Sequence, residues 1–167
     1  MLLLAVFALG AAPATARAKA ERLSLEEQTD LFRAETWRWQ TLMGTPRSPA
    51  HVNHPRADVA YRTWVLRLWH RRALHARRQA DRPPHKRHWL CIQGHEADWD
   101  ANTGNGYYGG LQMDLGFQRR YGTFLLRRKG TADRWAPLEQ MWVAERALRA
   151  GRGFFPWPNA ARICGAL

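Results

Sequence analysis

Apolar side chains recur at helical spacing through most of this chain of 167 residues, and glycine and proline divide the pattern into segments. Residues three and four positions apart lie on the same side of an α-helix, so the pattern predicts amphipathic helices that each bury one stripe. The predicted helices cover about residues 25–43, 58–80, 85–96, 114–121, 123–129 and 137–150. The chain is therefore expected to be mainly α.

Two stretches break this helical pattern. Residues 102–110 combine an Asn-Gly turn with paired tyrosines and paired glycines, which predicts a small hairpin or a tight loop lined by aromatic rings. Residues 154–158 read Phe-Phe-Pro-Trp-Pro, which is too rich in proline for a helix. We interpret this second stretch as an irregular aromatic segment that leads to Cys164.

Basic side chains are concentrated in one part of the chain. The formal net charge is +12, and residues 61–90 hold nine Lys or Arg side chains against the single acid Asp81. From Cys91 onward, ten basic residues face seven acidic ones. The excess charge therefore belongs mainly to the first helical pair, and it predicts an anionic partner such as nucleic acid, an anionic membrane or an acidic cell wall.

The first residues have the pattern of an export signal. Residues 1–16 carry no charged side chain, and two Ala-x-Ala sites follow the apolar run. We interpret residues 1–18 as a cleaved secretory signal peptide. A membrane anchor is the alternative, although the run is shorter than the roughly 20 apolar residues that span a bilayer. In an exported protein Cys91 and Cys164 are expected to pair, and two buried free thiols are the alternative.

Glu96 is the candidate for chemistry in the residue pattern. It lies near the end of a predicted helix, ahead of Trp99 and the glycine-rich stretch. A carboxyl group beside an aromatic ring and away from water keeps its proton to higher pH, so it can protonate a glycosidic oxygen. The aromatic rings of Tyr107, Tyr108 and Trp157 are suited to stacking on sugars. A solvated cap or one half of an ion pair is the alternative role for such a glutamate.

Residues 99–112 read WDANTGNGYYGGLQ. This run resembles the transglycosylase-like domain of the resuscitation-promoting factors, in which the pattern W-x-x-N-T-G-N-G-Y-Y-G-G-x-Q occurs. The later amphipathic helix, the Trp157-Pro158 dipeptide and the following cysteine keep the order of that family. The resemblance covers about residues 88–167 and does not include the basic helical pair.

The resemblance implies a lysozyme-like α+β fold over residues 85–167, with a helical body and a small hairpin or loop lobe. A basic helical extension over residues 19–84 would precede it. The resemblance also implies a disulfide between Cys91 and Cys164, and no cofactor is expected. The histidine pairs His51–His54 and His85–His88 have the spacing of metal ligands, but no cysteine partner or Glu-x-x-His context completes a site, so no metal is expected. The residues expected to line the substrate groove are Trp99, Asn102, Thr103, Tyr107, Tyr108, Gly109, Gln112 and Trp157.

The spacing of the acid departs from the family's pattern. In that pattern the glutamate directly follows the first cysteine and lies five residues before the tryptophan. In this chain, the residue five positions before Trp99 is Gly94. Glu96 is the only nearby glutamate and lies three residues before Trp99. We assign the acid to Glu96, because a shorter loop before Trp99 would let it end the helix in the same place. The departure leaves open an altered or lost activity.

The expected function is cleavage of peptidoglycan between N-acetylmuramic acid and N-acetylglucosamine by a single acid. A lytic transglycosylase closes a 1,6-anhydro ring, and hydrolysis by water is the nearest variant. Asp98, Asp100 and Asp114 are interpreted as turn or cap residues. The expected protein is secreted or wall-associated and monomeric. Its expected partners are peptidoglycan strands, anionic wall polymers and other wall hydrolases.

Two alternatives remain from the sequence. One is a wall-binding protein that keeps the groove without catalysis. The other is a nucleic-acid-binding protein that uses the arginine-rich helix of residues 59–80, which would lose affinity steeply with salt. The export signal and the lack of any known nucleic-acid motif argue against the second, so no nucleic-acid partner is expected.

Overall fold

The computed structural model describes residues 23–50 and 58–167. The predicted signal peptide therefore lies outside the described residues, as does the histidine pair His51–His54. No helix in the described ranges has the length and apolar character needed to cross a membrane.

Helix α2 (Leu25–Met43) begins and ends where the sequence predicts. The hydroxyl of Ser24 accepts from the amide of Glu27, and the Glu27 carboxylate accepts from the amide of Ser24. This reciprocal pair satisfies two amides that the first helical turn leaves without partners. Gly44 ends the helix in the left-handed conformation, with φ of 69°.

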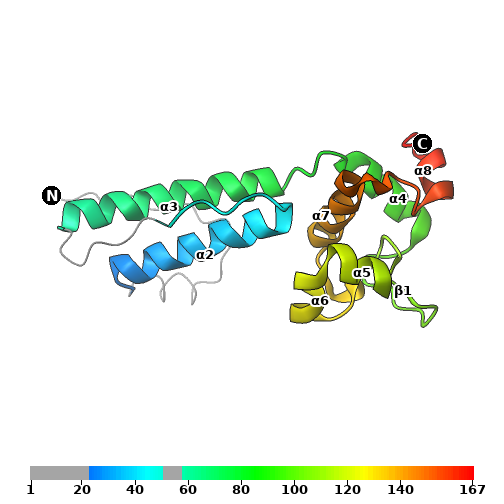
Figure 1. The fold of residues 1–167 in the computed structure, drawn as a ribbon, viewed down its shortest axis with the longest axis horizontal. Coiled ribbons are helices and arrows are strands. Elements are labelled where there is room, and N and C mark those ends of the chain that lie inside the picture. The colour runs from blue at the N-terminus through cyan, green and yellow to red at the C-terminus, as the bar shows by residue number, and fades with distance from the viewer. Residues whose placement is uncertain (1–22, 51–57) are drawn as a thin grey trace.

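Helix α3 (Val59–Ala80) lies beside α2 and runs parallel to it, as Figure 1 shows. Glu26 and Arg62, near the two N-termini, form an ion pair, and both C-termini reach the rest of the chain. Asp58 caps it by accepting from the amide of Tyr61. Val65 and Trp69 are buried along the side of α3 that faces α2, whereas the arginines Arg67, Arg71 and Arg78 are exposed. We call residues 23–50 and 58–80 the arm, because they project from the rest of the chain (Figure 1).

The rest of the described chain is a mainly helical body with one small sheet. Its helices are α4 (Lys86–Glu96), α5 (Leu115–Tyr121), α6 (Thr123–Lys129), α7 (Pro137–Ala147) and α8 (Pro158–Ile163), with a 3₁₀ turn at Ala132–Arg134 and a π-helical turn at Leu148–Arg152. Strands β1 (Tyr107–Tyr108) and β2 (Met113–Asp114) form an antiparallel hairpin, in which Tyr108 lies opposite Met113. The hairpin and the mainly α class are as predicted.

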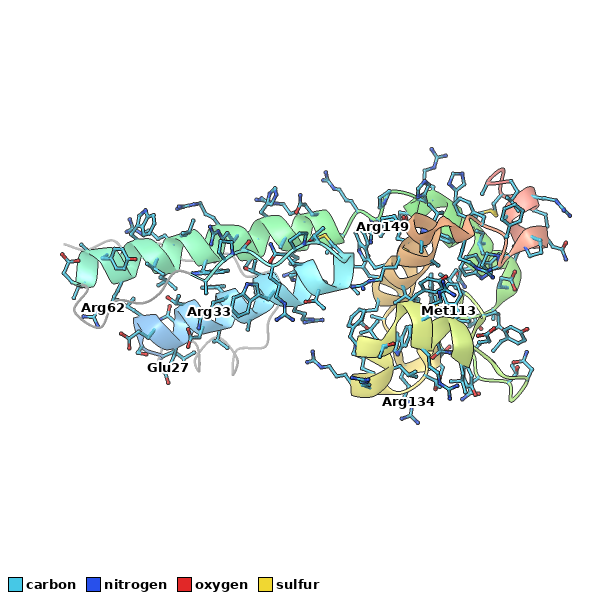
Figure 2. The ribbon with its side chains drawn as sticks, viewed as in Figure 1. Glu27, Arg33, Arg62, Met113, Arg134 and Arg149 are labelled. Carbon is cyan, nitrogen blue, oxygen red and sulfur yellow. A yellow bond between two sulfur atoms is a disulfide. The ribbon has the colours of Figure 1, made fainter. Side chains whose placement is uncertain are left out.

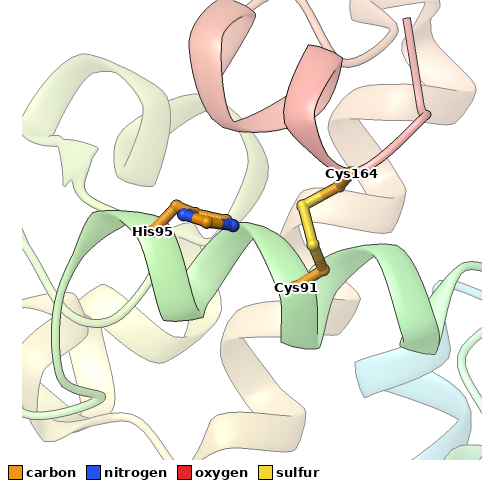
Figure 3. Close-up of side chains that lie close together, drawn as sticks. All are labelled: Cys91, His95 and Cys164. Atoms are coloured by element: carbon orange, nitrogen blue, oxygen red, sulfur yellow. A yellow bond between two sulfur atoms is a disulfide. The ribbon is translucent and has the colours of Figure 1, made fainter.

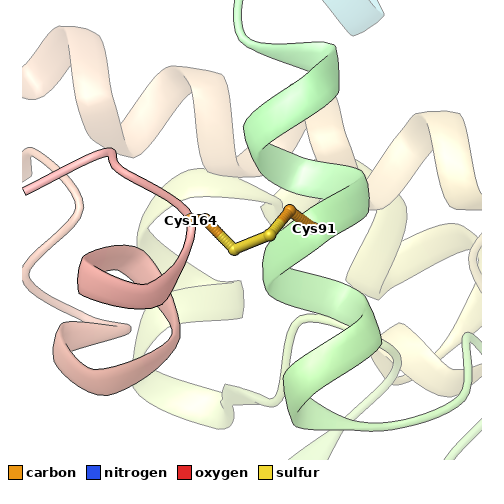
Figure 4. The surroundings of a disulfide bond; sticks show 2 residues. All are labelled: Cys91 and Cys164. Carbon is orange, nitrogen blue, oxygen red and sulfur yellow. A yellow bond between two sulfur atoms is a disulfide. The ribbon is translucent and has the colours of Figure 1, made fainter.

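The prediction holds only in part at the end of the chain. Residues 154–157 are non-helical turns, as predicted, but Pro158–Ile163 form helix α8, which the sequence did not predict. Pro158 is compatible with this helix because it occupies the first turn, where the missing amide hydrogen has no intrahelical partner to lose. The predicted disulfide is confirmed, and it joins Cys91 of α4 to Cys164 at the end of α8 (Figure 4).

Helix α7 connects the arm to the body. Its Trp142 indole donates to the carbonyl of Ala80 at 2.7 Å, at the end of α3. Arg146 donates to the carbonyl of Thr41, and Arg149 donates to that of Met43 at 2.6 Å, at the end of α2. The carbonyls at both helix ends thus find partners on α7 and the turn after it. Figure 2 shows Arg149 at this junction.

The arm and the body also share one apolar core. Leu42, Met43, Ala76 and Ala80 from the arm belong to the same buried cluster as Trp142 and the other core residues of the body. The arm is therefore packed onto the body rather than tethered to it.

Candidate active site

Helix α4 ends at Glu96, and a side chain from the same helix organises the chain that follows. Ala97 turns into extended backbone, with its amide donating to the carbonyl of Gln93. The Gln93 side-chain amide in turn donates to the carbonyl of Ala97 at 2.8 Å. These two bonds hold the residue directly after Glu96 against the last turn of the helix.

The Glu96 carboxyl is partly desolvated although its side chain is exposed overall. This burial raises its pKa above the ordinary value, and the positive charge of the neighbouring His95 opposes the shift to a smaller extent. A carboxyl with a raised pKa keeps its proton to higher pH, which is the property needed in a general acid.

The hairpin lies against the end of α4. Gly110, between the two strands, approaches so closely that a Cβ atom there would be 2.8 Å from Cγ of Gln93 and 2.9 Å from Cε3 of Trp99. Only glycine fits at such a distance. The packing brings the hairpin, the Trp99 ring and the helix end that carries Glu96 into one place.

The loop before the hairpin is joined to it by backbone contacts. Asn102 forms a bridge with Tyr108, and the amide of Gly109 donates to the carbonyl of Ala101 at 2.8 Å. Tyr107 is 48% exposed, so its ring is available for contact, whereas Tyr108 is half-buried against the core. Thr103 is exposed in the same loop.

Gln140 of α7 is a structural centre that the sequence reasoning missed. Its side chain is fully buried, and Nε2 lies 2.7 to 3.1 Å from the carbonyl oxygens of Trp99, Ala132 and Trp135. Its Oε1 accepts from the amide of Leu111 at 3.4 Å. The available signal was a polar side chain directly before the apolar run of residues 141–144, because buried polar groups require partners.

Gln112 adopts a backbone conformation that its neighbours must maintain. Its φ is 44°, the one positive value for a non-glycine residue in the described part of the chain. Leu111, directly before it, accepts from the Trp157 indole at 2.6 Å and donates to Gln140. Unfavourable backbone conformations persist where surrounding contacts over-determine them, and they often occur at functional sites.

Trp157 does not have the role that the sequence predicts. It is only 3% exposed and packs edge-on against Trp89. A ring so buried offers no face to a sugar, so Trp157 supports the hairpin through its bond to Leu111 instead. Asp114 caps α5 by accepting from the amide of Phe117 at 2.6 Å, in agreement with its interpretation as a cap residue.

One group of possible metal ligands occurs among the described residues. Donor atoms of Cys91, His95 and Cys164 lie within 4.8 Å of one another (Figure 3). The two sulfurs are bonded to each other in the disulfide, so they cannot serve as thiolate ligands. His85, from the other histidine pair considered, lies against Glu145 instead, with Nδ1 3.2 Å from a carboxylate oxygen.

Comparisons with known proteins match the part of the chain that carries this site. Residues 84–160 match the family model of the transglycosylase-like domain. Resuscitation-promoting factor RpfE from Mycobacterium tuberculosis is 41% identical over 75 residues, which cover 45% of this chain and 37% of that protein. Resuscitation-promoting factor Rpf1 from Corynebacterium glutamicum is 40% identical over 76 residues, which cover 45% and 36%.

The chain thus matches little more than a third of the length of these two curated relatives. The match includes α4, the hairpin, α7 and the start of α8, and it leaves out the arm. Residues 84–160, with their mainly α fold, are thus similar to the transglycosylase-like domain family.

Proposed function

We propose that this protein cleaves the glycan strands of peptidoglycan between N-acetylmuramic acid and N-acetylglucosamine, with Glu96 as its single acid and base. The observation that carries the proposal is the position of Glu96, at the end of α4 where this helix packs against the hairpin of the family's motif. The raised pKa of its carboxyl agrees with the proposed role.

In the proposed mechanism, protonated Glu96 donates its proton to the glycosidic oxygen, and the bond to C1 of the muramoyl residue breaks. The Glu96 carboxylate then takes the proton of the muramoyl 6-hydroxyl, whose oxygen bonds to C1 and closes a 1,6-anhydro ring. The proton is thus returned, and no water is consumed. Because the nucleophile belongs to the substrate, no second carboxylate is required. Water in place of the 6-hydroxyl would give hydrolysis.

The proposed substrate groove follows the hairpin and the loop before it. The exposed ring of Tyr107 would stack on a sugar, and the half-buried Gln112 would contact substrate with Oε1, because its Nε2 is engaged by the carbonyl of Gly109 at 2.9 Å. The remaining proposed groove residues are Trp99, Asn102, Thr103, Tyr108 and Gly109.

The proposed organisation has three parts. Residues 1–18 would be a signal peptide, residues 19–84 a basic extension that holds the protein to anionic wall polymers, and residues 85–167 the enzymatic unit. The protein would be secreted, act as a monomer at the wall, and work beside other wall hydrolases. The family match and the predicted export signal support this arrangement.

The test is cleavage of purified peptidoglycan by the wild type and Glu96→Gln. The variant keeps the size of the side chain but cannot donate the proton, so activity should fall by about 10²- to 10⁴-fold. Asp98→Asn is the matched control, because Asp98 is an exposed carboxylate two residues away, and it should retain activity.

Mass spectrometry of the released fragments would distinguish anhydro ends from reducing ends and so identify the reaction. Equal cleavage by the wild type and Glu96→Gln would remove Glu96 from the mechanism. Binding of the wild type to peptidoglycan without any cleavage would favour a wall-binding protein instead.

A further inference from the structure

A hollow of about 390 Å³ lies on the arm, beside α3 and the segment that follows α2. Its lining consists of cationic, polar and small apolar side chains, without a carboxylate: Gln40, Ser48, Leu68, Arg71, Arg72, His75, Ala76 and Gln79. None of the proposed catalytic or groove residues belongs to it. The hollow therefore requires an explanation separate from the active site.

The wall of the hollow is held in place before any ligand arrives. The Gln40 side chain donates to the hydroxyl of Ser48 at 2.8 Å and accepts from its amide at 2.9 Å. The Arg72 guanidinium lies 4.9 Å from the centre of the Trp69 ring and donates to the carbonyl of Pro49. Ordering these groups in advance lowers the entropy that binding would cost.

The positive charge of the hollow is not neutralised within the described residues. The ion pairs of the arm are Arg33 with Asp30 and Arg62 with Glu26, and neither includes a residue of the hollow. Arg71 is exposed and forms no hydrogen bond or ion pair in the described ranges. Two guanidinium groups and an imidazole at one hollow, without an acid among its lining residues, indicate an anionic ligand.

The arrangement of the cations favours phosphate over carboxylate. Consecutive residues of an α-helix project about 100° apart, so Arg71 and Arg72 would approach a ligand from different directions. A tetrahedral phosphate presents oxygens in several directions, whereas a planar carboxylate presents one edge to one guanidinium fork. Leu68 and Ala76 add apolar surface suited to the carbon skeleton of a polyol or sugar.

We propose that this hollow binds a phosphate-bearing unit of a phosphodiester-linked polyol or sugar chain. A further exposed arginine, Arg67, lies on the same helix about one turn before Arg71 and would meet a neighbouring phosphate of the chain. Because α7 fixes the arm to the body, a polymer bound to the arm would hold the proposed active site at a fixed distance from the polymer. That the chain belongs to the cell wall rests on the proposed function, but the binding itself does not.

The test is a calorimetric titration of the full-length protein with poly(glycerol phosphate) oligomers. Arg71→Gln should weaken binding by about tenfold or more, because a charge-assisted hydrogen bond is lost. Arg78→Gln is the matched control: it removes the same charge from the same helix but does not line the hollow. It should weaken binding by about twofold, because salt screens charges beyond roughly 8 Å.

Circular dichroism of both variants would confirm that the arm remains folded. Equal losses in the two variants, or no binding by the wild type, would overturn the site. Equally tight binding of a polygalacturonate, a carboxylate polymer, would overturn the preference for phosphate. Tighter binding of phosphatidylglycerol vesicles would overturn the choice of a polymer. Titration of Glu96→Gln should give wild-type affinity, so the site can fail or stand independently of the enzymatic proposal.

Discussion

Two effects act in opposite directions on the pKa of Glu96. Partial burial raises its pKa, and the charge of His95 lowers it. Replacing His95 with Asn removes the second influence, so the pKa of Glu96 should rise further. Because the proposed acid must be protonated, the alkaline limb of the pH profile of kcat/KM should move to higher pH.

Soluble peptidoglycan fragments would serve as the substrate for this pH profile. His88→Asn is the control, because His88 lies on α4 two turns before His95 and is not among the causes of the Glu96 shift. A limb that stays in place in His95→Asn, or that moves equally in both variants, would contradict the assignment of Glu96 as the acid.

At individual residues, the sequence predicted roles correctly where the residue type itself limits the role, as for paired cysteines. The pairing of Cys91 with Cys164 was predicted and is present. Gln140 was missed because its importance depends on three carbonyls from two other segments, one of them 41 residues away at Trp99. Trp157 was assigned to substrate binding because the sequence shows that a residue is aromatic but does not show whether its ring is exposed. Burial is decided by packing, and here it is nearly complete.

The hairpin depends on glycines for two different physical reasons, which two substitutions can separate. Gly109 has φ of 73°, and a Cβ atom there would lie 2.5 Å from Oε1 of Gln140. Gly104 has a similar φ of 77° but open space around it. Gly104→Ala should therefore cost only backbone strain, about 1 kcal/mol of unfolding free energy. Gly109→Ala should cost clearly more, about 2 to 4 kcal/mol, because the buried Gln140 must also move.

Urea unfolding of both variants would measure these losses, and cleavage of peptidoglycan would measure their effect on function. Gly109→Ala should also reduce cleavage, because Gln140 positions the amide of Leu111 beside Gln112. Equal stability losses at the two glycines would show that the contact with Gln140 is unimportant.

At the level of elements, periodicity predicted the helices well because each has an apolar stripe and a recognisable end. The Ser24 capping box, the Asp58 cap and Gly44 all function as their residue types indicate. Helix α8 was missed because its preceding residues are rich in proline and its six residues are too few to show a period. It is stabilised by burial of Ala160 and Ala161 and by the disulfide at its end.

For the whole molecule, the contacts between α7 and the arm predict that arm and body unfold together. Arg149→Gln removes a cation from the end of α2, where it donates to the carbonyl of Met43. Such contacts at a helix C-terminus contribute about 0.3 to 2 kcal/mol, so stability should fall by roughly that amount. Arg152→Gln is the matched control, because Arg152 is exposed and makes no hydrogen bond in the described ranges.

Urea unfolding followed by both circular dichroism and tryptophan fluorescence would check this prediction. The two signals should show one shared transition, lowered in Arg149→Gln and nearly unchanged in Arg152→Gln. Separate transitions in the wild type would show that the arm folds independently of the body.

The sequence by itself determined the helical class, the hairpin and the basic helix, because periodicity, turn residues and charge are local properties. It proposed Glu96 as the candidate acid. The tertiary structure decided which groups meet: Gln140 with the hairpin, the arginines of α7 and its following turn with the end of α2, and Arg71 and Arg72 with one hollow. These contacts depend on burial and on the packing of segments that are distant in the sequence, which no local pattern specifies.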